Sequence, residues 1–426
     1  MRKTGDHGLP GRRTVVCIRK MNKNFKKFLL LWSGELISAI GGGLTSFGLG
    51  VYIFNETGSA AGMALVTLLG FLPTVILSVP AGVLADRFDR RLMMMTGDGC
   101  SALGIFFILI NMLRGQASLT VICVGVFVSA SFSALLEPSY KATITDLLTP
   151  DEFSKASGLV SIAGSARYLF SPVIAGFLLA VSDVKLLLII DICTFFLTVA
   201  GAAVVKKGIP TNAVGKTLSL MDSLKDGWKV ITEKKGILTL VIVSSFITLF
   251  LGMFQILAEP FILSFSDEKT LGIGETVCAL GMLVSALYLG MRGIKKKFVL
   301  TLGLSLTMAG IFMMGFGFRQ NIYLICFFGF LFFMSLPVAN NCLEYLVRIN
   351  IPGEVQGRAW GFIGFISQIG YVVAYAVSGV AADAIGHVTG KGVGTGASTV
   401  IEIAGILLVM ISIVLLAMKG LRELEK

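Results

Sequence analysis

Charged and metal-binding side chains are scarce in this chain of 426 residues. Asp, Glu, Lys and Arg make up 14% of the sequence, whereas soluble domains average about 25%. The two histidines, His7 and His387, have no other ligand residue at metal-site spacing. The seven cysteines form no Cys-x-x-Cys pair, and we expect them to be reduced packing residues. This scarcity excludes an ordinary soluble domain, a zinc module and a disulfide scaffold.

Motifs for nucleotide-driven and hydrolytic chemistry are also missing. There is no His-Glu-x-x-His and no Gly-x-Ser-x-Gly sequence. The segment Gly215-Lys216-Thr217 resembles the end of a phosphate loop, but the first glycine of that loop would fall on Pro210. We therefore expect that the protein is not an enzyme, that it has no ATP-hydrolysing module, and that it binds no metal or cofactor. Any energy-requiring step would therefore draw on an ion gradient or on a partner protein.

Basic residues are in excess, and the net charge is +11. They lie in loops between apolar runs rather than on one face, which argues against nucleic acid as a partner. If the amino terminus is cytoplasmic, the loops on the opposite side of the membrane hold few basic residues: Arg114, Lys185, Lys269, Arg319 and Lys391. The positive-inside rule then predicts a multi-pass protein of the cell membrane with both termini in the cytoplasm.

Apolar residues dominate the rest, at 55% of the chain, and there are 50 glycines. The runs long enough to cross a bilayer are 28–53, 61–85, 92–113, 118–140, 157–181, 184–205, 237–264, 272–291, 298–317, 321–347, 357–384 and 397–418. The pattern predicts an all-α membrane protein with about twelve transmembrane helices.

The longest polar stretch lies halfway along the chain, at 206–236, where apolar residues at helical spacing predict an amphipathic cytoplasmic linker. It separates two six-helix bundles, 28–205 and 237–418, flanked by a basic tail at 1–27 and a short tail at 419–426. Residues 1–20 precede an alternative start at Met21. Pro150-Asp151-Glu152 recurs as Pro352-Gly353-Glu354 in the second half, and such internal repeats are typical of secondary transporters.

One loop carries a recognisable motif. It follows the second predicted helix and reads Gly82-Val83-Leu84-Ala85-Asp86-Arg87-Phe88-Asp89-Arg90-Arg91. This resembles the signature G-x-x-x-D-R-x-x-R-R/K of the major facilitator superfamily, with Asp89 where many members have glycine. The resemblance implies two pseudo-symmetric six-helix bundles and a conformational gate formed by Gly82, Asp86, Arg87, Arg90 and Arg91.

Further segments resemble the macrolide-efflux branch of that superfamily, from about Trp32 to the carboxyl end. They are Thr57-Gly58-Ser59, Gly357-Arg358 and Ala382-Asp383. A partial antiporter signature in the fifth helix matches at Gly158, Pro172 and Gly176, but has Arg167, Ser171 and Ala175 where relatives have glycine. The resemblance implies a proton-coupled exporter of hydrophobic or amphiphilic compounds.

Ionisable residues inside predicted membrane helices are candidates for proton coupling, because a charge in hydrocarbon is costly. They are Glu35, Asp98 and Arg167. Relatives often carry an acid at the position of Gly42, and Glu35 lies two turns earlier on the same helix face. Competition between a proton and a cationic drug for Glu35 is the simplest exchange mechanism. Arg167 pairs either with Asp98 or Glu35 as a switchable gate, or with a fixed partner that holds the fifth helix.

Polar residues at helical spacing on otherwise apolar helices are candidates to line a central cavity. They are Ser38, Ser133, Ser244, Thr248, Gln255, Asn341, Gln368, Tyr371 and Tyr375. Such residues also join helices to one another, so each has two interpretations. We expect a monomer whose partners are a small lipophilic substrate and membrane lipids. Alternatives are an exporter of a lipid, siderophore or other metabolite, and a transport-inactive membrane sensor or scaffold.

Overall fold

The computed structural model describes residues 23–115, 117–206, 232, 235–294, 296–351, 356–418, 421 and 423–425. Most of the predicted amphipathic linker at 206–236, and the tail at 1–20, lie outside these residues. The helices of the first half are α1 (Lys23–Thr57), α2 (Ala60–Arg87), α3 (Arg90–Arg114), α4 (Leu119–Ser133), α5 (Leu136–Leu147), α6 (Pro150–Leu169), α7 (Ser171–Val181) and α8 (Val184–Lys206). Those of the second half are α10 (Lys235–Leu263), α11 (Glu268–Arg292), α12 (Phe298–Gly317), α13 (Ile322–Asn350), α14 (Gln356–Thr389) and α15 (Val393–Ala417), followed by a 3₁₀ turn at Glu423–Glu425.

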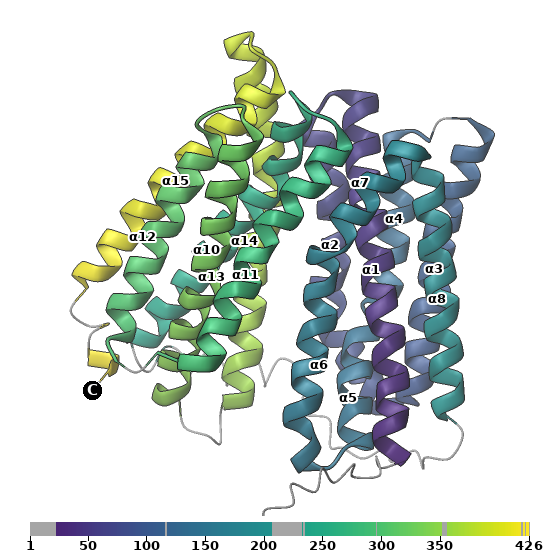
Figure 1. Cartoon of the computed structure of the whole chain (residues 1–426). Coiled ribbons are helices and arrows are strands. Elements are labelled where there is room, and N and C mark those ends of the chain that lie inside the picture. The colour runs from purple at the N-terminus through teal and green to yellow at the C-terminus, as the bar shows by residue number, and fades with distance from the viewer. Residues whose placement is uncertain are drawn as a thin grey trace, which may run out of the picture.

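These helices supply 12 segments long and apolar enough to cross a membrane, and the described part of the chain contains no strand. The all-α prediction is therefore confirmed. Figure 1 shows two bundles side by side, α1–α8 in one and α10–α15 in the other. The start of α1 and the carboxyl-terminal segment lie at the lower end in that view. The opposite end, which holds the α1–α2 and α14–α15 loops, is called the far end below.

Two predicted helices are each broken into two pieces by proline. The segment predicted as 118–140 divides into α4 and α5 after Ser133, and the segment predicted as 157–181 divides into α6 and α7 at Phe170. Pro138 and Pro172 lack a backbone N–H, and their rings crowd the carbonyl four residues earlier. Each break therefore lies within one turn before its proline.

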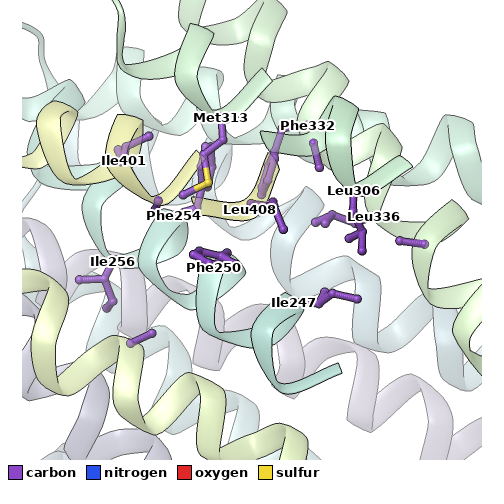
Figure 2. Packing of buried hydrophobic residues seen from close by; sticks show 14 of the residues in the cluster. Ile247, Phe250, Phe254, Ile256, Leu306, Met313, Phe332, Leu336, Ile401 and Leu408 are labelled. Atoms are coloured by element: carbon purple, nitrogen blue, oxygen red, sulfur yellow. The ribbon is translucent and has the colours of Figure 1, made fainter. Parts of the chain in front are cut away.

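The core of the second bundle is aromatic. Phe254 of α10 stacks on Phe332 of α13 with ring centroids 4.4 Å apart, and its ring lies 4.5 Å from that of Phe316 in α12. Figure 2 shows Phe254 and Phe332, with Met313 and Leu408 near them. Rings at these distances add about 0.5–1.5 kcal/mol per pair beyond their burial, so α10, α12 and α13 are held as one unit.

The first bundle relies on close backbone approach between small residues. Gly104 of α3 and Gly125 of α4 face each other so closely that a Cβ on either would collide with the carbonyl oxygen of the other. Lipid gives little hydrophobic drive for helix association, so close van der Waals packing at small residues replaces it. The same device joins Gly310 of α12 to Gly405 of α15 in the second bundle.

The two bundles meet at the far end through a carboxylate that caps a helix of the other bundle. Asp383, near the carboxyl end of α14, accepts hydrogen bonds from the Ser59 hydroxyl (2.6 Å) and from the backbone N–H groups of Ala60 (2.9 Å) and Ala61 (3.0 Å). Gly379, one turn earlier in α14, lies against Ala60 and has no room for a Cβ. The start of α2 is thus fixed to α14.

Two further contacts reinforce this closure. Asn55, near the end of α1, donates a hydrogen bond of 3.0 Å to Glu268 at the start of α11. The ammonium of Lys269 lies 4.9 Å from the centre of the Phe177 ring in α7. The contacts made by Asp383, Asn55 and Lys269 all lie at the far end.

Candidate functional site

An acidic cluster lies inside the first bundle, toward the end where α1 begins. Glu35 of α1 is partly buried, and its carboxylate is close enough to Asp98 of α3 and Glu137 of α5 to interact with both electrostatically. Asp98 is 2% exposed and accepts a hydrogen bond of 2.5 Å from Thr198 of α8. Its other oxygen, Oδ1, has no hydrogen-bond partner, and neither has the buried hydroxyl of Tyr140. The structure therefore places Glu35 and Asp98 within electrostatic range of each other.

A second buried acid lies farther along the same helices. Asp191 of α8 is 1% exposed and accepts a hydrogen bond of 2.6 Å from Thr45 of α1 and a longer one of 3.4 Å from Thr194. Gly41 leaves room for the Asp191 side chain, because a Cβ at position 41 would lie 2.8 Å from the carboxylate oxygen. The Thr194 hydroxyl also donates at 2.7 Å to the backbone carbonyl of Asp191 itself, so the bond from Thr45 is the main one to this carboxylate and joins α1 to α8.

Aromatic side chains from both bundles meet about halfway along their helices. Phe71 of α2 lies 5.6 Å from the ring of Tyr371 and 5.5 Å from that of Tyr375, both in α14. Tyr375 donates a hydrogen bond of 3.1 Å to Gln255 of α10, and Tyr168 of α6 is within electrostatic range of both α14 tyrosines. We call these five residues the central aromatic cluster.

Arg167 lies beside this cluster. The methylene stem of its side chain packs on Gly43 of α1, where a Cβ would lie 3.1 Å from Cγ. Its guanidinium is exposed and close enough to Tyr375 and Asp191 to interact electrostatically. In this structure Arg167 forms no ion pair with Asp98 or Glu35. Both acids lie at the level of Glu35 on α1, about two turns away from Gly43, where the Arg167 side chain packs.

Three of the nine predicted cavity-lining residues instead join helices. Ser244 of α10 shares a hydrogen bond of 2.5 Å with Ser367 of α14, and Thr248 donates one of 2.6 Å to the carbonyl of the same serine. Ser133 of α4 bonds to Ser101 of α3 at 2.9 Å. In each of these three residues the hydroxyl forms a hydrogen bond to another helix of its own bundle. They therefore join helices.

The remaining cavity candidates differ in exposure. Ser38 is 7% exposed, so it faces packed side chains rather than an open space. Asn341 and Gln368 are exposed. Gln255, Tyr371 and Tyr375 belong to the central aromatic cluster and are the candidates at which the two bundles meet.

Comparison with known proteins decides the family. The sequence profile of the Major Facilitator Superfamily matches residues 31–375, most of the chain. The chain belongs to the major facilitator superfamily. This transporter is 26% identical over 387 residues to macrolide efflux protein A of Streptococcus pyogenes, covering 87% of this chain and 92% of that protein. It is 23% identical to the multidrug efflux pump Tap of Mycolicibacterium fortuitum, covering 85% and 90%.

Solved structures confirm the superfamily fold. A bacterial homologue of the lysosomal transporter Spinster, crystallised inward-facing and unoccupied, has a TM-score of 0.72 at 12% identity and covers 95% of this chain and 99% of that one. The nucleoside transporter NupG gives a TM-score of 0.74 at 13% identity, covering 91% and 99%. Together with the twelve apolar helices, these matches establish a multi-pass membrane protein of this superfamily.

The superfamily signature loop is only partly described. The side chains of Asp86 and Arg87 lie outside the described residues, and Gly82 has open space beside it. Arg90 donates a hydrogen bond of 3.2 Å to the carbonyl of Ala142 in α5. Arg91 is 3% exposed. The two described arginines of the signature therefore lie partly or fully within the first bundle.

Asp89, the departure from the signature, has a local role that the sequence did not reveal. It is the N-cap of α3, and its carboxylate accepts hydrogen bonds from the backbone N–H groups of Arg91 (2.9 Å) and Leu92 (3.4 Å). A carboxylate suits this place because the first N–H groups of a helix have no intrahelical acceptor. The substitution of glycine by Asp is thus compatible with a well-formed α3.

The antiporter-like motif of the superfamily falls on the contact between the bundles. Pro172 and Gly176 are buried in α7, and Gly272 of α11 packs on both, with its Cα 3.4 Å from a Cβ built at Gly176. The Gly158 environment lies outside the described residues. In this chain the motif therefore lets α7 and α11 approach at the far end.

Proposed function

We propose that this chain is a proton-driven exporter of hydrophobic or amphiphilic compounds that works by alternating access. The efflux proteins of similar sequence support export, and the basic loops support a cell membrane with both termini in the cytoplasm. Under that orientation the far end is external, and the closure at Asp383 makes this structure the inward-facing state.

The observation that carries the proton coupling is the pair of Glu35 and Asp98; the third acid beside them, Glu137, is exposed and pairs with Lys141 at 2.6 Å. The charged groups that interact with Glu35 are both acids, and Asp98 is almost fully buried with one oxygen unpaired. Carboxylates that share a poorly solvated site repel one another, and binding a proton relieves this repulsion. The cluster is therefore suited to take up and release a proton as its access to water changes.

The central aromatic cluster supports a substrate site between the bundles. Its rings come from α2 and α6 of one bundle and α14 of the other. Sites for small apolar ligands are lined mainly by hydrophobic and aromatic side chains with a few polar groups that fix orientation. Because the residues belong to both bundles, rocking of one bundle against the other changes the site directly, as alternating access requires.

Transport into liposomes with an imposed pH gradient tests the proposal. Macrolides, cationic dyes and lysolipids would be screened for gradient-dependent movement by the purified full chain. We expect movement of at least one compound to collapse in Glu35→Gln, while folding and substrate binding persist. Glu402→Gln is the matched control, because Glu402 lies in α15 away from the cluster and should leave transport unchanged.

Two outcomes would contradict the proposal. Gradient-driven transport that survives in Glu35→Gln would remove this residue as the proton carrier. Failure of well-folded wild-type protein to move any screened compound in either direction would favour a different substrate or the sensor and scaffold alternative.

A further inference from the structure

Arg167 is a cation at mid-depth in a membrane protein, and nothing in the described residues neutralises it at close range. It lies 14 residues before the end of α7 at Val181, about 21 Å along the helix. An arginine side chain reaches only about a third of that distance, so it cannot place its guanidinium at the far-end interface. The near end of the apolar span, Ile162, is only five residues away, so the direction of the side chain decides where the charge lies.

The side chain is directed to the space between the bundles rather than to lipid. Its stem lies on Gly43 of α1, in its own bundle, and its guanidinium interacts electrostatically with Tyr375 of α14, in the other. A charged group exposed at this depth is tolerated where it lines a water-filled cavity, not where it faces hydrocarbon. The interaction with Tyr375 therefore places the guanidinium on the side of α6 that faces α14.

The nearest acid is already occupied. Asp191 interacts with Arg167 electrostatically, but it is 1% exposed and its carboxylate accepts a hydrogen bond of 2.6 Å from Thr45. Within the described residues, no carboxylate lies within ion-pair distance of the Arg167 guanidinium, and no hydrogen bond to it is formed. Asp191 thus stabilises the charge of Arg167 at longer range but accepts no hydrogen bond from the guanidinium.

We propose that Arg167 binds an anionic group of the transported amphiphile, while the central aromatic cluster holds the apolar part. This rests on the proposed function, and it names the substrate class of the same site. A guanidinium presents five N–H donors in a planar fork that fits a carboxylate, sulfate or phosphate. Tyr375, Tyr371 and Phe71 present ring faces and edges beside it.

The placement also separates substrate from proton. Gly43, which supports Arg167, lies eight residues beyond Glu35 on α1, about 12 Å along the helix axis. Substrate and proton then occupy different sites, and they are coupled through the change between inward-facing and outward-facing states rather than by competition for one carboxylate.

Binding of two probes with the same tail tests this inference without a proton gradient. The probes are a fluorescently labelled dodecanoic acid and its neutral dodecanamide, titrated into the full chain in phosphatidylcholine nanodiscs. We expect the wild type to bind the acid roughly tenfold more tightly than the amide, as one charge-assisted bidentate contact allows. Arg167→Gln should abolish the difference by weakening only the acid, and Arg167→Lys should restore part of it.

Arg319→Gln is the matched control, because Arg319 lies in a far-end loop and its removal should leave the ratio at the wild-type value. Equal affinity of the wild type for both probes would overturn the inference, whether or not the variants fold. So would an Arg167→Gln variant that keeps the preference for the acid.

Two further arms locate the source of the anion and keep the two proposals apart. Phosphatidylglycerol added to the nanodiscs would compete with the acid if a membrane lipid is the natural ligand, whereas no competition indicates a free amphiphile; both results support an anion site. A preference for the acid with no gradient-driven transport would leave this inference standing and refute the proposed function. Gradient-driven transport without any preference would do the reverse.

Discussion

Asp383 offers the sharpest test of how the two bundles are held closed at the far end. Its carboxylate accepts three hydrogen bonds from the start of α2, across the boundary between the bundles. A negative charge at a helix amino terminus is further favoured by the helix dipole. In an outward-facing state the bundles part at this end, so all three bonds must break.

The size of the effect follows from these contacts. A hydrogen bond to a charged group contributes about 1.5–3 kcal/mol, and Asp383 is only partly buried, so the lower figure applies. Asp383→Asn keeps one acceptor oxygen and loses the charge and the second acceptor. We expect the far-end closure to weaken by about 2 kcal/mol, which shifts the ratio of the two states roughly thirtyfold toward the outward-facing one.

Distance measurements between spin labels on the two bundles can detect this shift. Arg114 and Lys391 are exposed far-end positions in different bundles and are suited to labelling in a background without native cysteines. Asp383→Asn should increase the population of long distances. Asp183→Asn is the control, because Asp183 pairs with Lys185 at 3.1 Å inside one bundle. An unchanged distance distribution in Asp383→Asn would refute the proposed closure.

Three further predictions concern stability, each read as a melting temperature in detergent. Asp89→Ala should lower stability by about 1 kcal/mol through loss of the α3 cap, and no change would show that the cap is dispensable. Gly104→Val should destabilise by about 1–3 kcal/mol through overpacking, whereas Gly99→Val should be tolerated because the nearest atom to its Cβ is 3.9 Å away; equal effects would contradict the packing argument. Hydrogen bonds from Thr270 hold the pKa of Asp267 below its ordinary value of 3.8. Because the folded-state pKa is depressed, the stabilisation is present above that ordinary value and is lost as the pH falls through the folded-state value. The advantage of the wild type over Asp267→Ala should therefore persist at neutral pH and shrink below about pH 4, and an advantage independent of pH would contradict this assignment.

The fold was predictable because apolar length and loop charge are properties of the sequence itself. Each crossing needs about 20 apolar residues, and these runs are separated by Gly, Pro and basic loops. The breaks before Pro138 and Pro172 were missed, although proline carries the signal. A hydrophobicity count does not register that proline interrupts hydrogen bonding in a run that remains apolar.

The candidate site was predictable only in part. Glu35, Asp98 and Arg167 stand out because ionisable residues are rare in membrane helices, yet which acid lies near Arg167 depends on the rotation of helices about one another. Ser244 and Thr248 share a helix face with Gln255, and periodicity cannot tell a face that meets another helix from one that meets the cavity. Phe71 and Tyr168 went unnoticed, since aromatic side chains face lipid, core and cavity alike.

Proton movement coupled to substrate movement tests the central claim most directly. Liposomes containing the full chain and a trapped pH-sensitive dye would receive a transported compound with no pH gradient imposed. We predict that flow of the compound drives an opposite flow of protons in the wild type and in Glu402→Gln, and that the proton signal disappears in Glu35→Gln. Substrate flow with no proton signal in the wild type would contradict the account of a proton-driven exporter.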